Sequence, residues 1–522
     1  MEGNPLQKGR SLEDHEHLRI EKEKKKCCTP YKCVKITAGT VFTLSLALCC
    51  VVWFTSLYWY LIRLRVTIDP SNQMYPNWVA TPLTTKNCIT LFNYTNVPEF
   101  MAKQHPTLKI ERVGPICFRE QPLKENIVFK SGGLVDYDDS RTLKLWPEET
   151  KVNLSDTVTI PNVAFLSTIT LSTDFMPTFQ NLLLSFIPKN STNLTPFLTM
   201  NISDYVMGWD DDIHNAVTTA AAPLGITLPF NQSGVVPWMA GFLKVRMTAE
   251  TGHRNTQRIG KLTQINGQPR LRLWESKDCN TLKGSDGIYF PPNDVRTGNP
   301  IYFYFVLLCR SIKLTKLKEV ELQEGLMVPR YVMEEKTLAA PAKNPENACY
   351  CRKKGYCYNT TEGLAPFDLK PCLGIPLLLT SPNMNLYPKS LLTHLEGYEM
   401  NITDPHDFDT YFDVLPNLGI TVRYMQNGQI NLRVGKVRQF ANVLPNWGND
   451  RMLPMYYFQR TGDNLPKVNF KTMYDAQVVF ADIEFLLKWL FLTTAFLSGL
   501  VCAYLISRTR IAKKAEAKFA LK

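Results

Sequence analysis

Two long runs of apolar residues lie near the ends of the chain, and shorter patterns of apolar and polar positions lie between them. The first run covers residues 36–62 and contains no charged side chain. The second covers residues 485–506 and contains one lysine, Lys488, near its start. Because about 20 apolar residues suffice for a helix to cross a bilayer, each run predicts a transmembrane helix.

A cleaved signal peptide and a buried core helix are the alternatives for these two runs. The apolar part of a signal peptide spans only about 7–15 residues, which is shorter than the first run. Aromatic residues gather at the end of the first run, between Trp53 and Tyr60, as in the aromatic belt of a membrane interface. The second run is followed by the basic segment 508–514, which is typical of a stop-transfer sequence. Both runs therefore predict uncleaved membrane anchors.

The long segment between the two runs predicts an α+β fold rich in strands. Asn266-Gly267 and Asn427-Gly428 each lie between apolar stretches, and Asn-Gly is a strong signal for a two-residue β-hairpin. Ile430, Leu432 and Val434 alternate with polar residues, which predicts a strand with one buried face. No internal repeat or long low-complexity linker divides the segment, so we expect one large domain.

One stretch departs from the strand pattern. Phe179, Leu182, Leu183 and Phe186 recur at helical spacing, and Pro188 ends the pattern. A core helix is one interpretation. An exposed apolar helix that receives a partner or a lipid is the other.

The charge of the chain supports a membrane topology. The 522 residues carry a formal net charge of +12. Residues 1–35 contain nine basic and six acidic side chains, and residues 508–522 contain six and one, so the tails account for +3 and +5. Basic residues flank membrane helices on the cytosolic side. We therefore expect a cytosolic tail over 1–35, membrane helices over 36–62 and 485–506, an extracellular or lumenal domain over 63–484, and a second cytosolic tail over 507–522.

Glycosylation sequons and cysteines agree with this topology. Eight N-x-S/T sequons all lie in the central segment, and we predict glycans at Asn93, Asn153, Asn190, Asn193, Asn201, Asn231, Asn359 and Asn401. Eight of the 14 cysteines lie there too, namely Cys88, Cys117, Cys279, Cys309, Cys349, Cys351, Cys357 and Cys372. An even number of cysteines in an oxidising compartment predicts disulfides, but eight cysteines alone allow about 105 connectivities. The juxtamembrane Cys27, Cys28 and Cys33 are candidates for palmitoylation, with reduced thiols as the alternative.

The sequence contains no pattern typical of an enzyme or a metal site. We find no GxSxG, HExxH or P-loop motif, and the histidines of the central segment are scattered. Asp210 to Asp212 and the acidic residues from Asp404 to Asp413 lack the EF-hand pattern, so we interpret them as loops and helix caps. We expect a protein that is not an enzyme and has no cofactor and no metal.

Several motifs resemble the class B scavenger receptor family. They include LFNYTNVPEF, IERVGPICFRE, VMGWDD, LWESKDCN, GSDGIYFPP, NPENACYC and LPNLGITVRYMQNGQINLRV, and they keep the family's order between the two anchors. The family includes fatty-acid and lipoprotein receptors, lysosomal integral membrane proteins and sensory neuron membrane proteins.

The resemblance implies a fold and a set of disulfides. The fold is a large antiparallel β-barrel-like ectodomain with an apical helical cluster and an internal apolar tunnel. The implied pairs are Cys279–Cys349, Cys309–Cys372 and Cys351–Cys357. Cys88 and Cys117 depart from the family's core pattern, but each lies in one of two neighbouring candidate strands, so we predict a further bridge between them.

The resemblance also implies where a lipid binds. The segment that matches the family's apex contains the candidate ligand-binding residues Phe179, Leu183, Phe186, Ile187 and Lys189. The neighbouring sequons at Asn190 and Asn193 and the acidic Asp210–Asp212 disfavour capture of large anionic lipoproteins.

The leading hypothesis is a cell-surface receptor that passes lipophilic ligands through the ectodomain tunnel to the membrane. The ligands include fatty acids, sterols, carotenoids, lipoproteins or pheromone-like lipids, and a protein ligand or co-receptor is a further partner to consider. Nucleic acid is not expected. A lysosomal or endosomal trafficking receptor of the same family is the main alternative. A two-pass ligand-gated channel subunit is the third, although the second apolar run lacks the acidic ring of a cation pore.

Overall fold

The computed structural model describes residues 30–520 except 56, 173–193, 223–229, 324, 352–356, 359, 401–406 and 436–450. The chain forms two compact units. One is built from the residues up to Ile62 and from Tyr474 onward, and the other is Arg63–Met473. Of the expected segment 63–484, the second unit contains Arg63–Met473, and residues 474–484 group with the terminal helices.

The first unit is helical. Its elements are α2 (Pro30–Phe54), α3 (Leu57–Leu64, which continues into the second unit), a π-helical turn (Asp475–Val479) and α14 (Phe480–Ala520). Two helical segments, Cys33–Phe54 and Lys467–Ala520, are long and apolar enough to cross a membrane. The second expected span, 485–506, lies within α14.

The first expected span is interrupted near its end. A single helix over 36–62 is expected from the apolar run, but α2 ends at Phe54 and α3 begins at Leu57. The Thr55 hydroxyl donates to the Val51 carbonyl at 2.6 Å and accepts from the Leu57 N–H at 3.3 Å. Thr55 therefore lies outside both helices, which the run of apolar residues alone does not predict.

Packing between α2 and α14 uses aromatic residues near one end and a small residue further along. Trp53 and Trp489 meet edge to face, with ring centroids 6.1 Å apart. Further along, a Cβ atom on Gly499 would lie 3.0 Å from the Phe42 ring. Small residues allow close approach of membrane helices, so Gly499 sets the separation at this contact.

The second unit is built on a sheet that contains 14 strands in the described residues. The main path runs β7-β6-β3-β2-β1-β16-β15-β14-β10-β9-β8, and every pair along it is antiparallel. The strands are β1 (Thr84–Tyr94), β2 (Leu108–Lys130), β3 (Leu134–Leu145), β6 (Val245–Glu250), β7 (Leu262–Ile265), β8 (Ile301–Phe305), β9 (Arg310–Glu321), β10 (Met327–Met333), β11 (Phe367–Asp368), β12 (Leu377–Thr380), β13 (Leu395–Glu396), β14 (Tyr411–Val414), β15 (Thr421–Val434) and β16 (Arg451–Asp463). A separate two-stranded sheet pairs β4 (Thr157–Pro161) with β5 (Phe197–Asn201).

A two-residue strip joins the two ends of this strand order. The backbone N–H of Leu262, at the start of β7, donates to the Gly284 carbonyl at 2.9 Å. The next residue, Ser285, forms a parallel bridge with Phe303 of β8. The sheet is therefore closed through residues 284 and 285, which gives the barrel-like core that the sequence resemblance implies.

The two Asn-Gly pairs have different structures. At Asn266-Gly267 both residues have positive φ, and Ile265 and Gln268 exchange backbone hydrogen bonds, so the expected tight turn is present. The expected hairpin at Asn427-Gly428 is wrong, because β15 continues through both residues and pairs them with Gln459 and Phe458 of β16. A Cβ atom on residue 428 would lie 2.8 Å from the Phe458 ring, so this glycine permits close packing rather than a turn.

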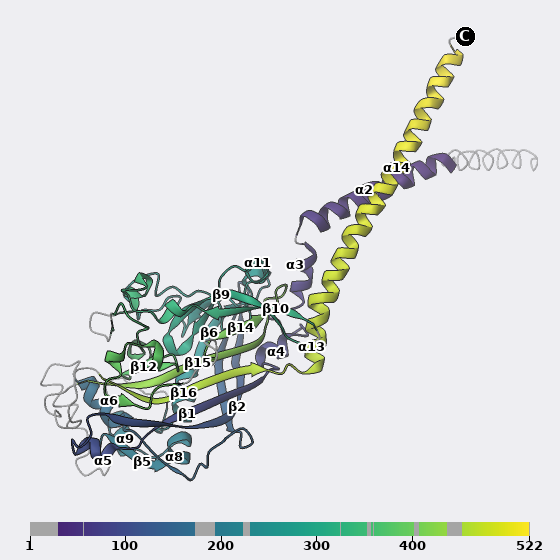
Figure 1. Ribbon diagram of the computed structural model, residues 1–522. Coiled ribbons are helices and arrows are strands. Elements are labelled where there is room, and N and C mark those ends of the chain that lie inside the picture. Colours follow the sequence, from purple (N-terminus) through teal and green to yellow (C-terminus); the bar gives the residue numbers. More distant parts are fainter. Residues whose placement is uncertain are drawn as a thin grey trace, which may run out of the picture. The chain divides into compact units, whose positions relative to one another are not determined.

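Short helices lie at both ends of the strands. Figure 1 shows α5, α6 and α9 gathered at one end of β1, β15 and β16, and α4 and α13 at the opposite end. The bounds are α4 (Tyr75–Val79), α5 (Val97–Met101), α6 (Val163–Ser172), α8 (Ile202–Met207), α9 (Asp212–Ala221), α10 (Val235–Leu243), α11 (Pro292–Thr297), α12 (Lys370–Leu373) and α13 (Lys467–Tyr474).

Four disulfides link the second unit. The pairs are Cys88–Cys117, Cys279–Cys349, Cys309–Cys372 and Cys351–Cys357, the four pairs expected from the sequence. Cys88 and Cys117 lie directly opposite each other on β1 and β2.

Candidate functional site

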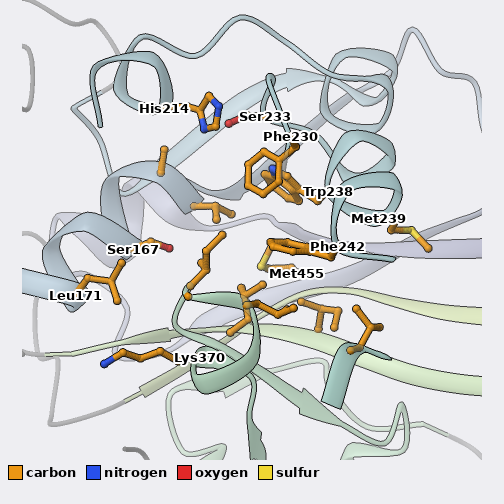
Figure 2. A pocket seen from close by; sticks show the side chains of 18 of the residues that line it. Ser167, Leu171, His214, Phe230, Ser233, Trp238, Met239, Phe242, Lys370 and Met455 are labelled. Atoms are coloured by element: carbon orange, nitrogen blue, oxygen red, sulfur yellow. The ribbon is translucent and has the colours of Figure 1, made fainter. Parts of the chain in front are cut away.

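An apolar cavity of about 460 Å³ lies between helices and the interior face of the barrel. Its size falls within the range of about 300–1,000 Å³ that is usual for small-molecule sites. Figure 2 shows residues of α6, α9 and α10 around it, together with Met455 of β16 and Lys370 of α12.

Helix α6 forms one wall because of its spacing. Five of its residues line the cavity, and they recur at intervals of three and four, which places them on one helical face: Val163, Ala164, Ser167, Thr168 and Leu171. The side-chain carbonyl of Asn162 accepts from the N–H of Phe165 at 3.1 Å and so caps the start of the helix.

Helix α9 forms a second wall, and its position depends on Asp211. The Asp211 carboxylate accepts from the N–H groups of Ile213 and His214 at 3.0 and 3.2 Å, and from the Ser233 hydroxyl at 3.0 Å. These bonds fix the first turn of the helix and tie it to the chain before α10. Asp211 therefore acts as a helix cap, as the sequence predicts for this acidic run.

His214 is a buried histidine in this wall. Its ring stacks on Phe230, with centroids 5.4 Å apart. Burial lowers the pKa of His214, and the nearby Asp211 carboxylate offsets only part of that effect. The imidazole is therefore uncharged at neutral pH and presents an aromatic face to the cavity.

Most hydroxyl groups that line the cavity are engaged elsewhere. Thr168 donates to the Ala164 carbonyl at 2.8 Å, and Thr218 donates to the His214 carbonyl at 2.7 Å. Ser167 differs, because its buried hydroxyl has no hydrogen-bond partner among the described residues. The cavity is therefore apolar in chemistry although several of its residues are polar by type.

A second, smaller cavity of about 40 Å³ adjoins the first. Four residues line both cavities, and we call them the neck: Met239, Leu243, Leu307 and Phe458. Beyond the neck lie six polar residues, five from the barrel strands and one just after the closing strip, which we call the polar floor: Asn87, Asp139, Arg141, Asp286, Gln426 and Arg460.

Buried ion pairs hold the polar floor together. Glu120, on β2 beside it, accepts from Arg460 at 2.7 Å and from Arg141 at 3.1 Å, and Arg141 also bonds Asp139 at 3.0 Å. Burial would raise the pKa of Glu120, but the two arginines hold it below its usual value.

Asp286 forms a second pair. It accepts from Lys124 at 3.1 Å and from the Tyr137 hydroxyl at 2.9 Å. Burial would raise the pKa of Asp286, but Lys124 holds it below its usual value. The three carboxylates Glu120, Asp139 and Asp286 are thus balanced by three cations, Lys124, Arg141 and Arg460.

The predicted site residues divide into described and undescribed positions. All five candidate ligand-binding residues, Phe179, Leu183, Phe186, Ile187 and Lys189, lie outside the described residues, as do Asn190, Asn193, Asn359, Asn401, Cys27 and Cys28. Asn153, Asn201 and Asn231 are exposed, Asn93 is partly buried, and Cys33 lies in the first turn of α2. Among the described residues, no group of three or more His, Cys, Asp or Glu side chains can hold a metal ion.

Sequence reasoning did not find the residues that line the cavity. The segment VAFLSTITLS gives a weak helical signal because serine and threonine interrupt its apolar positions. The polar floor comes from strand residues that the period-2 pattern alone does not place inside the barrel. The one sequence feature that hints at the polar floor is the pair of charged residues Glu120 and Lys124, whose even spacing places both side chains on the same face of β2.

Comparison with known proteins places the chain among membrane receptors. A model of the CD36 family matches residues 37–506. The chain is 24% identical to scavenger receptor class B member 1 of Rattus norvegicus over 403 residues, which cover 76% of this chain and 74% of that protein. It is 22% identical to sensory neuron membrane protein 2 of Heliothis virescens over 475 residues, which cover 86% and 88%. It is 21% identical to sensory neuron membrane protein 2 of Manduca sexta, with 90% and 93% covered.

Proposed function

Because the chain belongs to the CD36 family, we propose that it is a non-enzymatic membrane receptor that binds lipophilic ligands in the apolar cavity and passes them to the membrane. The observation that carries this proposal is the cavity itself. Helices α6, α9 and α10 line it, and two of its threonine hydroxyls, those of Thr168 and Thr218, bond the backbone of their own helices.

The physical benefit of such a cavity is shielding of hydrocarbon from water. Each buried CH₂ group is worth about 0.8 kcal/mol, so a long acyl chain resists leaving a lipid phase by about 10 kcal/mol. A protein cavity that replaces the lipid surroundings removes much of this barrier. Fatty acids, sterols, carotenoids and pheromone-like lipids are the ligand class that fits, either free or delivered by lipoprotein particles.

A route from the cavity toward the membrane completes the proposal. In the described residues the neck side chains line both the apolar cavity and the smaller cavity that contains the polar floor. Transfer of a ligand along the barrel therefore requires the neck side chains to move. The residues expected to receive the ligand at the apex belong to segment 173–193, which lies outside the described residues.

We propose a two-pass protein with both tails in the cytosol and residence at the plasma membrane, and the two terminal helical segments support the two-pass anchoring. The sequons are proposed as glycosylation sites and the juxtamembrane Cys27 and Cys28 as palmitoylation sites, whereas Cys33 is disulfide-bonded and is not proposed. A lysosomal or endosomal location is the alternative, and surface labelling of expressing cells distinguishes the two.

Two neighbouring threonines on α9 provide a matched test. Thr218 lines the cavity, whereas Thr219 is exposed, and each hydroxyl donates to the carbonyl four residues earlier. T218F fills the cavity and is expected to reduce uptake of a labelled long-chain lipid by expressing cells at least about fivefold, the effect of about 1 kcal/mol. T219F removes the same kind of hydrogen bond but leaves uptake unchanged. Equal uptake by both variants at equal surface level contradicts the proposal.

A further inference from the structure

The polar floor beneath the apolar cavity contains two buried polar atoms that lack partners among the described residues. The Asn87 side chain is almost fully buried, and its Oδ1 atom accepts no hydrogen bond. The Nε–H of Arg141 donates none. Buried polar groups are nearly always paired, so an unpaired acceptor and an unpaired donor lining one small cavity require an explanation.

The orientation of the Asn87 amide is fixed by its neighbour. Its Nδ2 donates to Glu120 Oε2 at 3.2 Å, and an ionised carboxylate only accepts hydrogen bonds. The oxygen is therefore the atom left unpaired. A group that both donates and accepts, such as a hydroxyl, supplies the kind of partner that each of these two atoms lacks.

The size of the small cavity limits what enters it. Its volume of about 40 Å³ holds only a small group, such as one hydroxyl or up to about three waters, because a single water requires about 10–15 Å³. A hydrocarbon chain does not fit. An amphipathic lipid therefore places its polar end beyond the neck and leaves its apolar part in the 460 Å³ cavity.

The charge of the floor selects among polar groups. The three carboxylates and three cations described above already balance one another. A ligand carboxylate added to the polar floor would be a buried charge without a partner of its own, which is strongly unfavourable. A hydroxyl adds no charge.

We propose that the polar floor is a head-group subsite that takes the hydroxyl group of a neutral amphipathic lipid, with Asn87 Oδ1 as acceptor and Arg141 Nε as donor. The proposal rests on the lipid-binding function proposed above and adds the chemical class of the ligand. A long-chain alcohol or a sterol fits this subsite, whereas a fatty acid keeps its carboxylate on the solvent side of the cavity.

A matched series of ligands tests the subsite. Full-length protein in digitonin micelles is titrated with hexadecane, hexadecan-1-ol and hexadecanoic acid, each competing with tritiated hexadecan-1-ol. We expect the alcohol to bind about tenfold more tightly than the alkane, the ratio for two net hydrogen bonds of ordinary strength. In N87L this ratio falls toward one, while the affinities for the alkane and the acid stay unchanged.

The control is T461V. Thr461 of β16 also has a buried hydroxyl without a partner among the described residues, but this residue lines neither cavity. This variant keeps the wild-type ratio. If N87L does not fold, L307W serves instead, because a larger side chain in the neck keeps the hydroxyl from the floor and also removes the preference for the alcohol.

Three other outcomes of the ligand titration would contradict either the head-group subsite or the proposed lipid-binding function. Equal binding of alcohol and alkane by the wild-type protein means that water alone meets the two atoms, and the subsite is wrong although lipid binding stands. Stronger binding of the acid that depends on Asn87 also overturns the subsite. No binding of any of the three ligands overturns both the subsite and the proposed function.

Discussion

Gly284 lies so close to the backbone carbonyl of Tyr302 that no room remains for a Cβ atom on residue 284. This contact occurs where the strip 284–285 joins β7 to β8 and closes the sheet. Gly284 also has a φ of +81°, which disfavours any residue with a side chain. Closure of the barrel therefore depends on the absence of a side chain at one position.

The first prediction follows from this contact. G284A is expected to destabilise the folded domain by more than about 3 kcal/mol, because it adds a clash with backbone atoms to the left-handed φ penalty of about 1–2 kcal/mol. Gly267 is the matched control, since its φ is +74° and nothing lies within 4 Å of its added Cβ. G267A is expected to cost only the φ penalty. Guanidinium unfolding followed by tryptophan fluorescence measures both, and equal losses contradict the role of Gly284 in closure.

The second prediction concerns the buried ion pairs. R460M removes one cation and so leaves the buried ion pairs around the polar floor with one excess negative charge, at Glu120. We therefore expect a loss of about 3–5 kcal/mol in unfolding free energy. Adding E120Q to R460M restores charge balance, and the double variant is expected to be more stable than R460M alone. A double-mutant cycle from unfolding curves measures the coupling. Additive losses in the cycle would mean that the two side chains do not interact.

The third prediction concerns pH. Burial lowers the pKa of His394 to about 4, and its Nε2 lies 2.7 Å from the Met452 carbonyl oxygen, a hydrogen bond in which the ring N–H donates. The unfolded chain takes up a proton near the ordinary histidine pKa of about 6.5, before the folded chain does. The domain is therefore expected to lose stability as pH falls from about 6.5 to about 4, by up to about 3 kcal/mol from this residue.

H394Q keeps a donor that does not titrate and isolates this contribution. The fall in unfolding free energy between pH 7.5 and pH 5 is expected to be smaller in H394Q than in the wild-type protein. The same fall in both proteins would exclude His394 as its source.

The fourth prediction concerns the membrane helices. G499L is expected to separate α2 from α14, because its side chain would meet the Phe42 ring. Cross-linking between cysteines introduced on the two helices should weaken in G499L. A503L, at an exposed position of the same helix, is the control and should cross-link as the wild-type protein does. Unchanged cross-linking in G499L would show that the contact does not depend on the glycine.

Some features of this protein follow from the sequence alone because their causes are local. A run of more than 20 apolar residues can form only a helix in a bilayer, so the spans near 36–62 and 485–506 required no tertiary information. The turn at Asn266-Gly267 is also local, since both residues adopt the positive φ that such turns need.

Other features depend on contacts between distant segments. Asn427-Gly428 has the same turn signal, yet it lies inside β15 because β16 pairs with both residues and the Phe458 ring occupies the space above the glycine. The interruption of the first apolar run between Phe54 and Leu57 is likewise not visible in its pattern of apolar residues.

The candidate site depends most on tertiary structure. The sequence placed ligand binding on an apolar stretch near residue 183, whereas the described cavity is lined by helices with weak patterns and by strands far apart in the chain. Charged residues such as Glu120 and Arg460 lie 340 positions apart in sequence, and they meet because β2 and β16 pair on either side of β1. The sequence by itself thus determined the apolar terminal segments and the family, while the tertiary structure decided which residues face the cavity, because the inside of a barrel is defined by its closure.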